Sequence, residues 1–144
     1  GPVSYNTDKY QEGHVNWWDA VDVISSSGYY PADNWENQLD RIEAVVKKFD
    51  RPFFFAEAGC MSTEGSAAVP NDWTVRGGLA LEEQADFYRA MFAACEKRDW
   101  VSGFGLWSWN WCLPECARAQ QEKGYELYEK PAEKVVRNFY ETRK

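Results

Sequence analysis

The chain has 144 residues, 44% of them apolar, so it can form one globular domain with a single core and is not a disordered tail. Its formal net charge of −7 argues against nucleic acid as a partner, because phosphate binding needs clustered Lys and Arg side chains. Membrane-spanning helices are excluded as well, since no apolar run approaches about 18 residues.

Four short apolar segments, each bounded by polar residues or glycine, indicate β-strands. In chain order they are Val3–Asn6, Val21–Ile24, Pro52–Ala58 and Val101–Trp111. A short helix is expected between the first two, at Asp8–Gln11 or around Asn16–Ala20.

Three longer segments have the apolar period of amphipathic helices. The first runs from Asn34 to Phe49 with Asp33 or Asn34 as its N-cap, the second from Leu81 to about Lys97, and the third opens at Pro131. The side chains predicted to be buried are Trp35, Leu39, Ile42, Val46 and Phe49, then Leu81, Ala85, Tyr88, Phe92 and Cys95, then Val135, Val136, Phe139 and Tyr140.

Strands that alternate with amphipathic helices are typical of parallel βαβ units. The sequence therefore predicts an α/β fold in one domain over residues 1–144, of which Gly1 and Pro2 resemble a remnant of protease cleavage. The Ser62–Gly78 segment follows a predicted strand and is long for a βα loop. Loops in that position carry function in α/β barrels.

Glu57 ends a predicted strand that is otherwise wholly apolar. Burying an unpaired carboxylate is costly, so Glu57 must lie at the open end of the strand or meet partners there. Barrel enzymes place catalytic groups at that end, which makes Glu57 a candidate catalytic residue. The alternative is a carboxylate that only forms an ion pair and caps the next element.

Tryptophans recur with period two in the last predicted strand, at Trp107, Trp109 and Trp111. Period two puts all three on one face. We expect Trp107 to pack in the core, and we expect Trp109 and Trp111 to emerge into a cleft as a platform for a sugar ring. Stacking on nucleic acid would need nearby basic residues, which this segment lacks.

Two tyrosines, Tyr29 and Tyr30, follow the second strand. Either hydroxyl could bind the catalytic carboxylate or a sugar, or could be buried with a satisfied hydrogen bond. Asn6, at the end of the first strand, is a further candidate for substrate binding. His14 is the only histidine and is interpreted as structural or exposed.

The four cysteines, Cys60, Cys95, Cys112 and Cys116, form no C-x-x-C pair, so a structural zinc site is not expected. Cys112 and Cys116 frame a short loop and could form a disulfide in an exported protein or stay free in an intracellular one. The compartment, secreted or cytoplasmic, stays open. No metal or other cofactor is expected.

Several segments, taken in order, resemble glycoside hydrolase family 113. They are Trp17–Ile24, Gly28–Pro31, Phe55–Gly59, Trp109–Trp111, Lys123–Tyr125 and Lys130–Glu133. That family belongs to a clan of retaining (β/α)8-barrel hydrolases, and its characterised members are mainly β-1,4-mannanases. The resemblance extends from about Val3 to Arg143.

The resemblance implies that the chain is a C-terminal half barrel, whose strands five to eight are Val3–Asn6, Val21–Ser27, Phe53–Glu57 and Gly103–Trp109. Glu57 then matches the family's nucleophile, and Trp109 matches the aromatic floor beneath the sugar being cleaved. Tyr29 or Tyr30 matches the tyrosine that positions the nucleophile.

There are two departures from the family pattern, and the first bears directly on activity. The family's acid/base Glu ends the fourth strand, which precedes this chain, and Ser27 stands where an acidic residue is expected. Retaining hydrolysis needs two carboxylates about 5–5.5 Å apart. Only Glu57 is evident, and nothing in the sequence favours Glu64, Asp72 or Glu115 as a substitute.

A half barrel would expose unpaired strand edges and its inner face to water. The resemblance therefore implies closure, by a second copy in a homodimer or by a complementary N-terminal half barrel. The leading hypothesis is a glycoside hydrolase domain that acts on an oligo- or polysaccharide such as β-1,4-mannan. The first alternative is a half barrel that binds carbohydrate or assembles without catalysis, and the second is an α/β domain unrelated to sugars whose tryptophans are all core.

Overall fold

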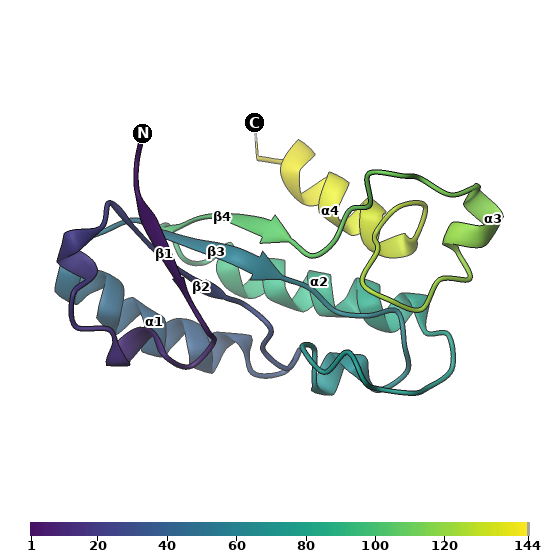
Figure 1. Ribbon diagram of the computed structural model, residues 1–144, viewed down its shortest axis with the longest axis horizontal. Helices are drawn as coiled ribbons and strands as arrows, with labels where there is room; N and C mark the ends of the chain where they lie inside the picture. Colours follow the sequence, from purple (N-terminus) through teal and green to yellow (C-terminus); the bar gives the residue numbers. More distant parts are fainter. Residues whose placement is uncertain (144) are drawn as a thin grey trace.

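A computed structural model describes residues 1–143 as a single open sheet of four parallel strands with helices between them (Figure 1). The strands follow chain order across the sheet: β1 (Ser4–Thr7), β2 (Val23–Ser27), β3 (Phe53–Ala58) and β4 (Val101–Leu106). Every neighbouring pair is parallel, which confirms the α/β prediction. The arrangement is that of a partial (β/α) barrel.

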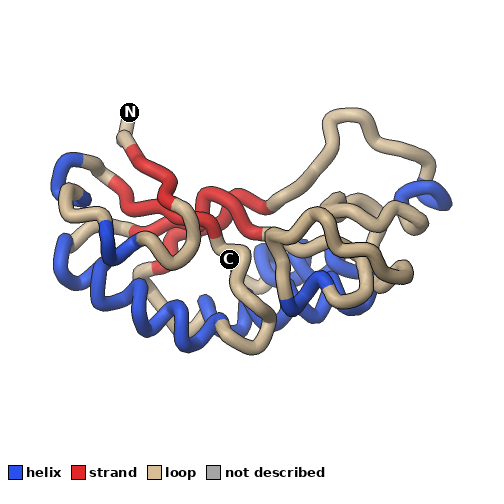
Figure 2. Tube along the Cα trace, turned by 60° about the horizontal axis from the view of Figure 1, so that its bottom comes forward, coloured by secondary structure: helices blue, strands red, loops and turns tan. Residues whose placement is uncertain are grey.

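The helices are α1 (Trp35–Phe49), α2 (Leu81–Cys95), α3 (Cys116–Ala119) and α4 (Pro131–Glu141), with short 3-10 helices η1 (Glu12–His14), η2 (Trp18–Ala20) and η3 (Ser66–Ala68). They lie in the connections between the strands, except for α3 and α4, which follow the last strand. The long helices lie on one side of the strands, and no helix covers the other side within the described chain (Figure 2). Of the two places predicted for a short helix between the first two strands, the one around Asn16–Ala20 holds the 3-10 helix η2, whereas Asp8–Gln11 is not helical and η1 follows it.

The helix-facing side of the sheet holds an aromatic core. Phe53 and Phe55 of β3 are fully buried, and the Phe55 ring meets Trp35 of α1 edge-on with ring centroids 5.4 Å apart. Phe139 of α4 stacks on Phe92 of α2 with centroids 3.9 Å apart, so the last helix docks through α2. Most of the predicted apolar stripes are therefore buried. Phe49, Leu81, Val135 and Val136 are only partly buried, and Tyr140 is 49% exposed although its ring meets Phe92 of α2 edge-on with centroids 6.4 Å apart.

The last strand is shorter than predicted. Pairing of β4 with β3 ends at Leu106 opposite Ala58, so Trp107, Trp109 and Trp111 lie in the loop that follows. The period-two alternation of tryptophans beyond Leu106 therefore does not come from a strand. In Figure 2 this loop rises above the sheet on the side away from the long helices.

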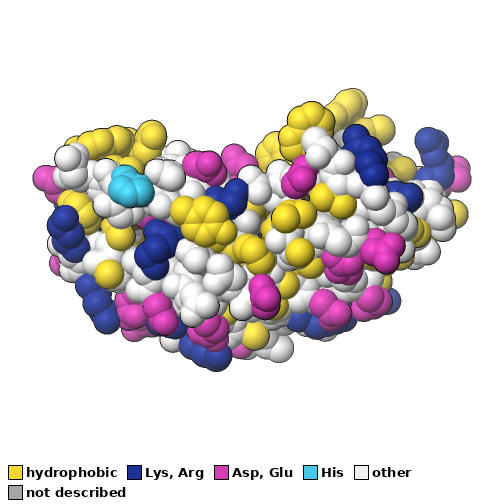
Figure 3. Space-filling model, turned by 90° about the horizontal axis from the view of Figure 1, so that it is seen from below, with side chains coloured by type: hydrophobic (Ala, Val, Ile, Leu, Met, Phe, Trp, Pro, Cys, Tyr) yellow, Lys and Arg dark blue, Asp and Glu magenta, His cyan; other side chains and the backbone are white. Residues whose placement is uncertain are grey.

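The helix-free face of the sheet carries alternate side chains of all four strands. Asn6, Val23, Phe54 and Ala56 help to line a hollow of about 590 Å³ on this face. Figure 3 shows the outline of the molecule dipping between two raised ends on which hydrophobic side chains gather. No helix within residues 1–143 has both the length and the apolar character needed to cross a membrane.

Candidate active site

Glu57 lies near the C-terminal end of β3, beside the end of β2. The pairing shifts between Ser26 and Ser27, so Ser27 stands opposite Glu57, and the next amide, of Gly28, donates to the Glu57 carbonyl at 2.6 Å. This irregularity brings the residues that follow β2 against the Glu57 side chain. The carboxylate is partly buried.

The Tyr29 hydroxyl donates a hydrogen bond to Glu57 Oε2 at 3.1 Å. Burial raises the pKa of Tyr29 well above its ordinary value, and the nearby Glu57 carboxylate raises it further. Tyr29 therefore keeps its proton and acts as a hydrogen-bond donor at any physiological pH. A donor aimed at one carboxylate oxygen fixes the orientation of the other.

A cleft of about 340 Å³ opens at Glu57, and its lining is mainly aromatic. Beside Glu57 it is formed by Tyr29, Asn71, Trp73, Trp107 and Tyr125. Glu57 is the one carboxylate in this lining, and no Lys or Arg side chain takes part. The arrangement combines one carboxylate with flat aromatic walls, which suits a neutral ring-shaped ligand with a reactive carbon.

Trp107 reaches this cleft from the point at which β4 ends. Its amide donates to the Ala58 carbonyl at 2.8 Å, its carbonyl accepts from the Tyr88 hydroxyl at 3.3 Å, and the Trp107–Ser108 peptide is cis. A β-carbon added at Gly59 would overlap the Trp107 carbonyl oxygen, so only glycine permits the two chains to meet there. We predicted Trp107 to be core, but its side chain is 50% exposed in the cleft.

The other predicted site residues are not brought together with Glu57. The hydroxyl of Tyr30 binds Glu12 instead, at 2.7 Å. Trp109 packs edge-on against Tyr128, Trp111 is 95% exposed, and neither lines the cleft. Asn6 lies on the helix-free face of the sheet.

The loop carboxylates considered as substitutes for a second acid also lie outside the cleft lining. Glu64 and Glu115 are exposed, and Asp72 accepts hydrogen bonds from the Thr74 amide and hydroxyl. Within residues 1–143 no group of three or more His, Cys, Asp or Glu side chains could hold a metal ion. All four cysteines are free, including Cys112 and Cys116.

Sequence reasoning missed three residues of the cleft: Asn71, Trp73 and Tyr125. The first two belong to the long loop after β3, whose length alone indicated a function. Tyr125 belongs to a segment almost 70 residues after Glu57 in the chain, so no local pattern connects them. Its ring meets Tyr29 edge-on with centroids 6.3 Å apart, and its hydroxyl donates to the Pro70 carbonyl at 2.7 Å.

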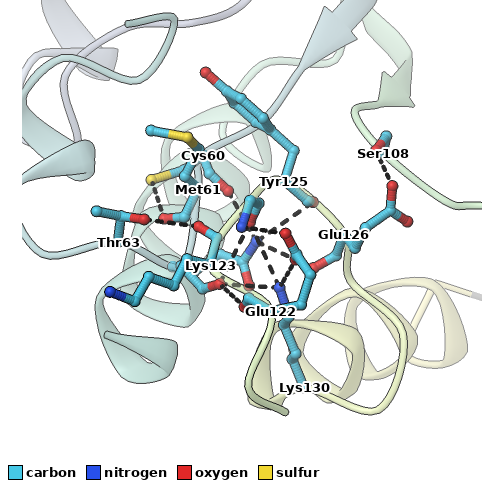
Figure 4. Close-up of polar contacts among 12 residues, drawn as sticks. Cys60, Met61, Thr63, Ser108, Glu122, Lys123, Tyr125, Glu126 and Lys130 are labelled. Carbon is cyan, nitrogen blue, oxygen red and sulfur yellow. Dashed lines mark hydrogen bonds and ion pairs between the residues drawn. The ribbon is translucent and has the colours of Figure 1, made fainter. Parts of the chain in front are cut away.

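Tyr125 is held by a set of polar contacts between the loop after β3 and the segment before α4 (Figure 4). Its carbonyl accepts from the Ser108 amide at 3.1 Å, and the Ser108 hydroxyl donates to Glu126 at 2.9 Å. The buried Gln84 side chain of α2 donates to the Cys60 carbonyl at 2.8 Å on the other side. Gln84 Nε2 also donates to the Tyr125 and Glu126 carbonyls at 3.4 Å each, so the backbone at Cys60 and at Tyr125 is tied to α2.

Lys130 stands at the centre of this set. Its side chain is 1% exposed, and Nζ meets Ser62 Oγ at 2.9 Å, Glu122 Oε2 at 2.6 Å and the Gly124 carbonyl at 3.5 Å. In Figure 4 the Lys130 ammonium points into these oxygens, whereas the Lys123 ammonium points away. Burial lowers the pKa of Lys130, and Glu122 opposes that shift.

A second buried ion pair supports the residues after β2. Glu12 is fully buried, accepts from Ser26 Oγ at 2.8 Å and from the Tyr30 hydroxyl, and lies 2.7 Å from Arg41 Nη1 of α1. Burial, followed by the Glu12 charge, raises the pKa of Tyr30. Tyr30 is therefore a structural tyrosine, and its neighbour Tyr29 is the one that faces the cleft.

Comparison with known proteins identifies the family to which the sequence and the fold are similar. A sequence profile of Glycoside Hydrolase Family 113 matches residues 1–130. Two solved structures of GH113 β-1,4-mannanase, one of them a complex, each share 55% identity and a TM-score of 0.96 over 99% of this chain. The GH113 β-mannanase AaManA from Alicyclobacillus acidocaldarius, in complex with ManMIm, shares 44% identity and a TM-score of 0.92 over 98% of it.

This chain is much shorter than the mannanases it resembles. It spans 46% of the length of the first two and 45% of AaManA. A Ruminococcus gnavus β-glucuronidase, with 17% identity and a TM-score of 0.71, shares the fold alone. None of the curated proteins matches the chain.

Proposed function

The chain belongs to glycoside hydrolase family 113, and from that premise we propose that it supplies the nucleophile and aromatic cleft of a retaining hydrolase of β-1,4-mannan. One observation carries the proposal. Glu57 lies at the C-terminal end of a parallel strand, accepts a hydrogen bond from Tyr29 at 3.1 Å, and lines a cleft walled by aromatic rings. The GH113 β-1,4-mannanase and β-mannanase structures reported above support the substrate class.

In the proposed reaction Glu57 attacks the anomeric carbon and forms a covalent glycosyl–enzyme ester while the glycosidic oxygen leaves. Tyr29 holds the carboxylate, and Trp107 faces the sugar. Protonation of the leaving oxygen needs a second carboxylate about 5–5.5 Å from the first. No second carboxylate lines the described cleft, so the acid/base residue comes from outside it.

We propose that the chain is the C-terminal half of a (β/α)8 barrel and that a complementary half closes it. The edges of β1 and β4 have no strand partner on their outer sides in residues 1–143, and the inner face of the sheet is hollow and partly apolar. Relatives that align with the whole chain are about twice its length. A second copy is the other candidate for closure, through a two-fold dimer.

Covalent labelling tests the nucleophile without the missing acid. A 2-fluoro-β-mannosyl fluoride carries a leaving group that needs no protonation: attack by Glu57 forms the ester bond, breaks the C–F bond and releases fluoride. The chain is labelled alone and after co-expression with the part of a GH113 β-1,4-mannanase that it does not match. We expect peptide mass spectrometry to find the adduct on Glu57.

The matched variants are Glu57→Gln and Glu64→Gln. Glu64 is exposed in the loop after β3 and outside the cleft lining, so its variant should label like the unmodified chain. Glu57→Gln should give no adduct while its circular dichroism stays unchanged. An adduct on any other residue, or none in a folded, co-expressed assembly, would refute the assignment of Glu57.

A non-catalytic carbohydrate-binding domain is the second candidate. It is favoured by the single carboxylate of the cleft, because a site that has lost its acid can still bind sugar through aromatic walls. Titration with mannotriose separates the two functions. Saturable binding without labelling or hydrolysis in the co-expressed assembly supports the second.

A further inference from the structure

The long loop after β3 presents a tryptophan that has no role in the core. Trp73 is 71% exposed, yet it lines the same cleft as Glu57. Its ring packs on no other aromatic ring in residues 1–143, in contrast to the aromatic contacts of the core. A large apolar side chain left in water beside a candidate active site needs an explanation, because burial of a ring this large is strongly favourable.

The backbone around Trp73 is held in place. Asp72 accepts hydrogen bonds from the Thr74 amide at 2.9 Å and from the Thr74 hydroxyl at 2.5 Å, which closes a turn around Trp73. Arg76 Nη1 donates to the Trp73 carbonyl at 3.3 Å. The turn thus presents the indole at a defined place without the support of core packing.

The base of the same loop is joined to the cleft. The Tyr125 hydroxyl, itself part of the cleft lining, donates to the Pro70 carbonyl at 2.7 Å. The Glu64 amide donates to the Gly78 carbonyl at 2.9 Å, which closes the loop at its other end. The position of Trp73 is therefore coupled to the wall that faces Glu57.

The chemistry around Trp73 suits a neutral pyranose ring. An indole face offers an apolar surface to the C–H side of a sugar, and the neighbouring Asn71 amide can both donate to and accept from hydroxyls. No Lys or Arg side chain lines the cleft, so neither an acidic sugar nor a phosphate would be neutralised there.

We propose that Trp73 is a specificity-determining residue, forming the aromatic platform for the sugar unit next to the one that Glu57 attacks. This role depends on the proposed function and extends it from the attacked ring to a neighbouring unit of the polysaccharide. It implies that binding strengthens with chain length through Trp73. A single mannose ring, bound at Trp107 and Glu57, gains nothing from it.

The test follows the indole N–H signals of the 144-residue chain by ¹⁵N NMR during titration with mannotriose and with methyl β-mannoside. The chain has eight tryptophans, and the Trp73 signal is the one lost in Trp73→Phe. The control is Val69→Ala, because Val69 is exposed in the same loop but outside the cleft lining.

We expect the Trp73 signal to shift saturably with mannotriose. Trp73→Ala should weaken mannotriose binding about tenfold, Trp73→Phe less, and Val69→Ala should not weaken it. Affinity for methyl β-mannoside should change less than about twofold in all three variants, which a general loosening of the fold would not reproduce.

The proposal is overturned if the Trp107 signal moves with mannotriose while the Trp73 signal stays, or if Trp73→Ala binds like the unmodified chain. It is also overturned if no indole signal responds to sugar. Labelling of Glu57 by the one-ring mannosyl fluoride is measured in a separate experiment, by mass spectrometry, and does not need Trp73. A failure of Trp73 is therefore distinguishable from a failure of Glu57.

Discussion

Two adjacent tyrosines, Tyr29 and Tyr30, donate to two different carboxylates. Tyr29 binds Glu57 at the cleft, and Tyr30 binds the buried Glu12 behind it. Substitution by Phe should therefore lower the rate of Glu57 labelling at position 29 and lower the free energy of unfolding at position 30.

In Tyr29→Phe we expect the rate of Glu57 labelling to fall by about tenfold or more, because a hydrogen bond to a charged group contributes about 1.5–3 kcal/mol. The free energy of unfolding should change by less than about 1 kcal/mol, since Glu57 remains reachable by water. Labelling kinetics and urea unfolding measure the two quantities. An unchanged labelling rate would mean that Tyr29 does not orient the carboxylate.

In Tyr30→Phe we expect the reverse. Glu12 is fully buried, so losing a donor to it should lower the free energy of unfolding by about 1–3 kcal/mol. The labelling rate per folded molecule should match that of the unmodified chain. A loss of labelling without a loss of stability would place Tyr30 in the active site after all.

These residues mark how far sequence reasoning reaches at this scale. The position of Glu57 at the end of its strand was predictable, because an unpaired carboxylate is costly to bury in an apolar strand. Tyr29 and Tyr30 could both be named as its partner, but the sequence did not decide between them. Glu12 was not predictable, since it stands among polar residues and its side chain is paired by Ser26, Tyr30 and Arg41 from elsewhere in the chain. Its role is set by tertiary structure alone.

Among the elements, the segment before α4 depends most on one side chain. Lys130 joins Ser62, Glu122 and Gly124 while almost fully buried. The sequence placed this lysine before a helix-opening proline, where a solvent-exposed side chain is usual, and nothing local signalled that the loop after β3 would cover it.

We expect Lys130→Met to lower the free energy of unfolding by about 1–3 kcal/mol, because Ser62 Oγ and the Gly124 carbonyl lose a buried donor, whereas water can solvate Glu122, whose side chain is 38% exposed. Amide hydrogen exchange should accelerate at Ser62, whose amide donates to the Gly124 carbonyl at 3.0 Å. The control is Lys134→Met, an exposed lysine of α4. If both variants unfold at the same urea concentration, Lys130 does not hold the two segments together.

The helices were predicted nearly to their ends, whereas β4 was extended too far. The apolar period of a helix lies within one segment of the sequence, because it reflects which face of that helix is buried. In α1 the predicted stripe is buried, with only Phe49 partly exposed. A strand ends where its neighbour stops pairing, and β3 stops at Ala58. The alternation of tryptophans in one segment does not show where the neighbouring strand stops pairing. Trp107 was therefore predicted to lie in the core and Trp109 in the cleft.

For the molecule as a whole, several buried acids set the response to alkali. Burial raises the pKa of the Cys60 and Cys95 thiols from 9.0 to about 12, and raises the pKa of Tyr88 above 10.0. A group with a higher pKa in the folded state contributes stability that is complete below its unfolded pKa and is lost as the pH rises toward the folded value. The pKa of Lys130 is lowered, so protonated Lys130 reduces the free energy of unfolding. That cost is relieved as the pH rises from the folded pKa toward 10.5.

We therefore expect the free energy of unfolding to fall from about pH 9 upward, because the thiols and tyrosines outnumber the one lysine. Urea unfolding between pH 7 and pH 11 measures this decline. In a Cys60→Ala, Cys95→Ala double variant the onset should move toward pH 10, where the tyrosines begin to titrate. An onset unchanged by the double substitution would show that the thiols do not contribute.

The open face of the sheet is the other property of the whole molecule. Phe54 lies in a hollow that no described element covers. Since water contact with such a face is unfavourable, we expect light scattering on a sizing column to give a mass above 16.7 kDa, and Phe54→Lys to lower it to that of one chain. A monomeric unmodified chain would indicate that the face tolerates water and would remove the argument for closure by a second copy.

The contact between Gly59 and Trp107 also sets the terms for engineering this scaffold. The loops after β3 and β4, which carry Trp73 and Trp109, begin from one shared junction where a side chain on Gly59 has no room. Loops grafted from other barrels must therefore be joined to the chain after Gly59 and after Trp107, so that the contact between these two residues is kept. Recombination libraries that place a crossover inside this junction should yield mostly misfolded products, whereas crossovers beyond it should exchange substrate preference freely.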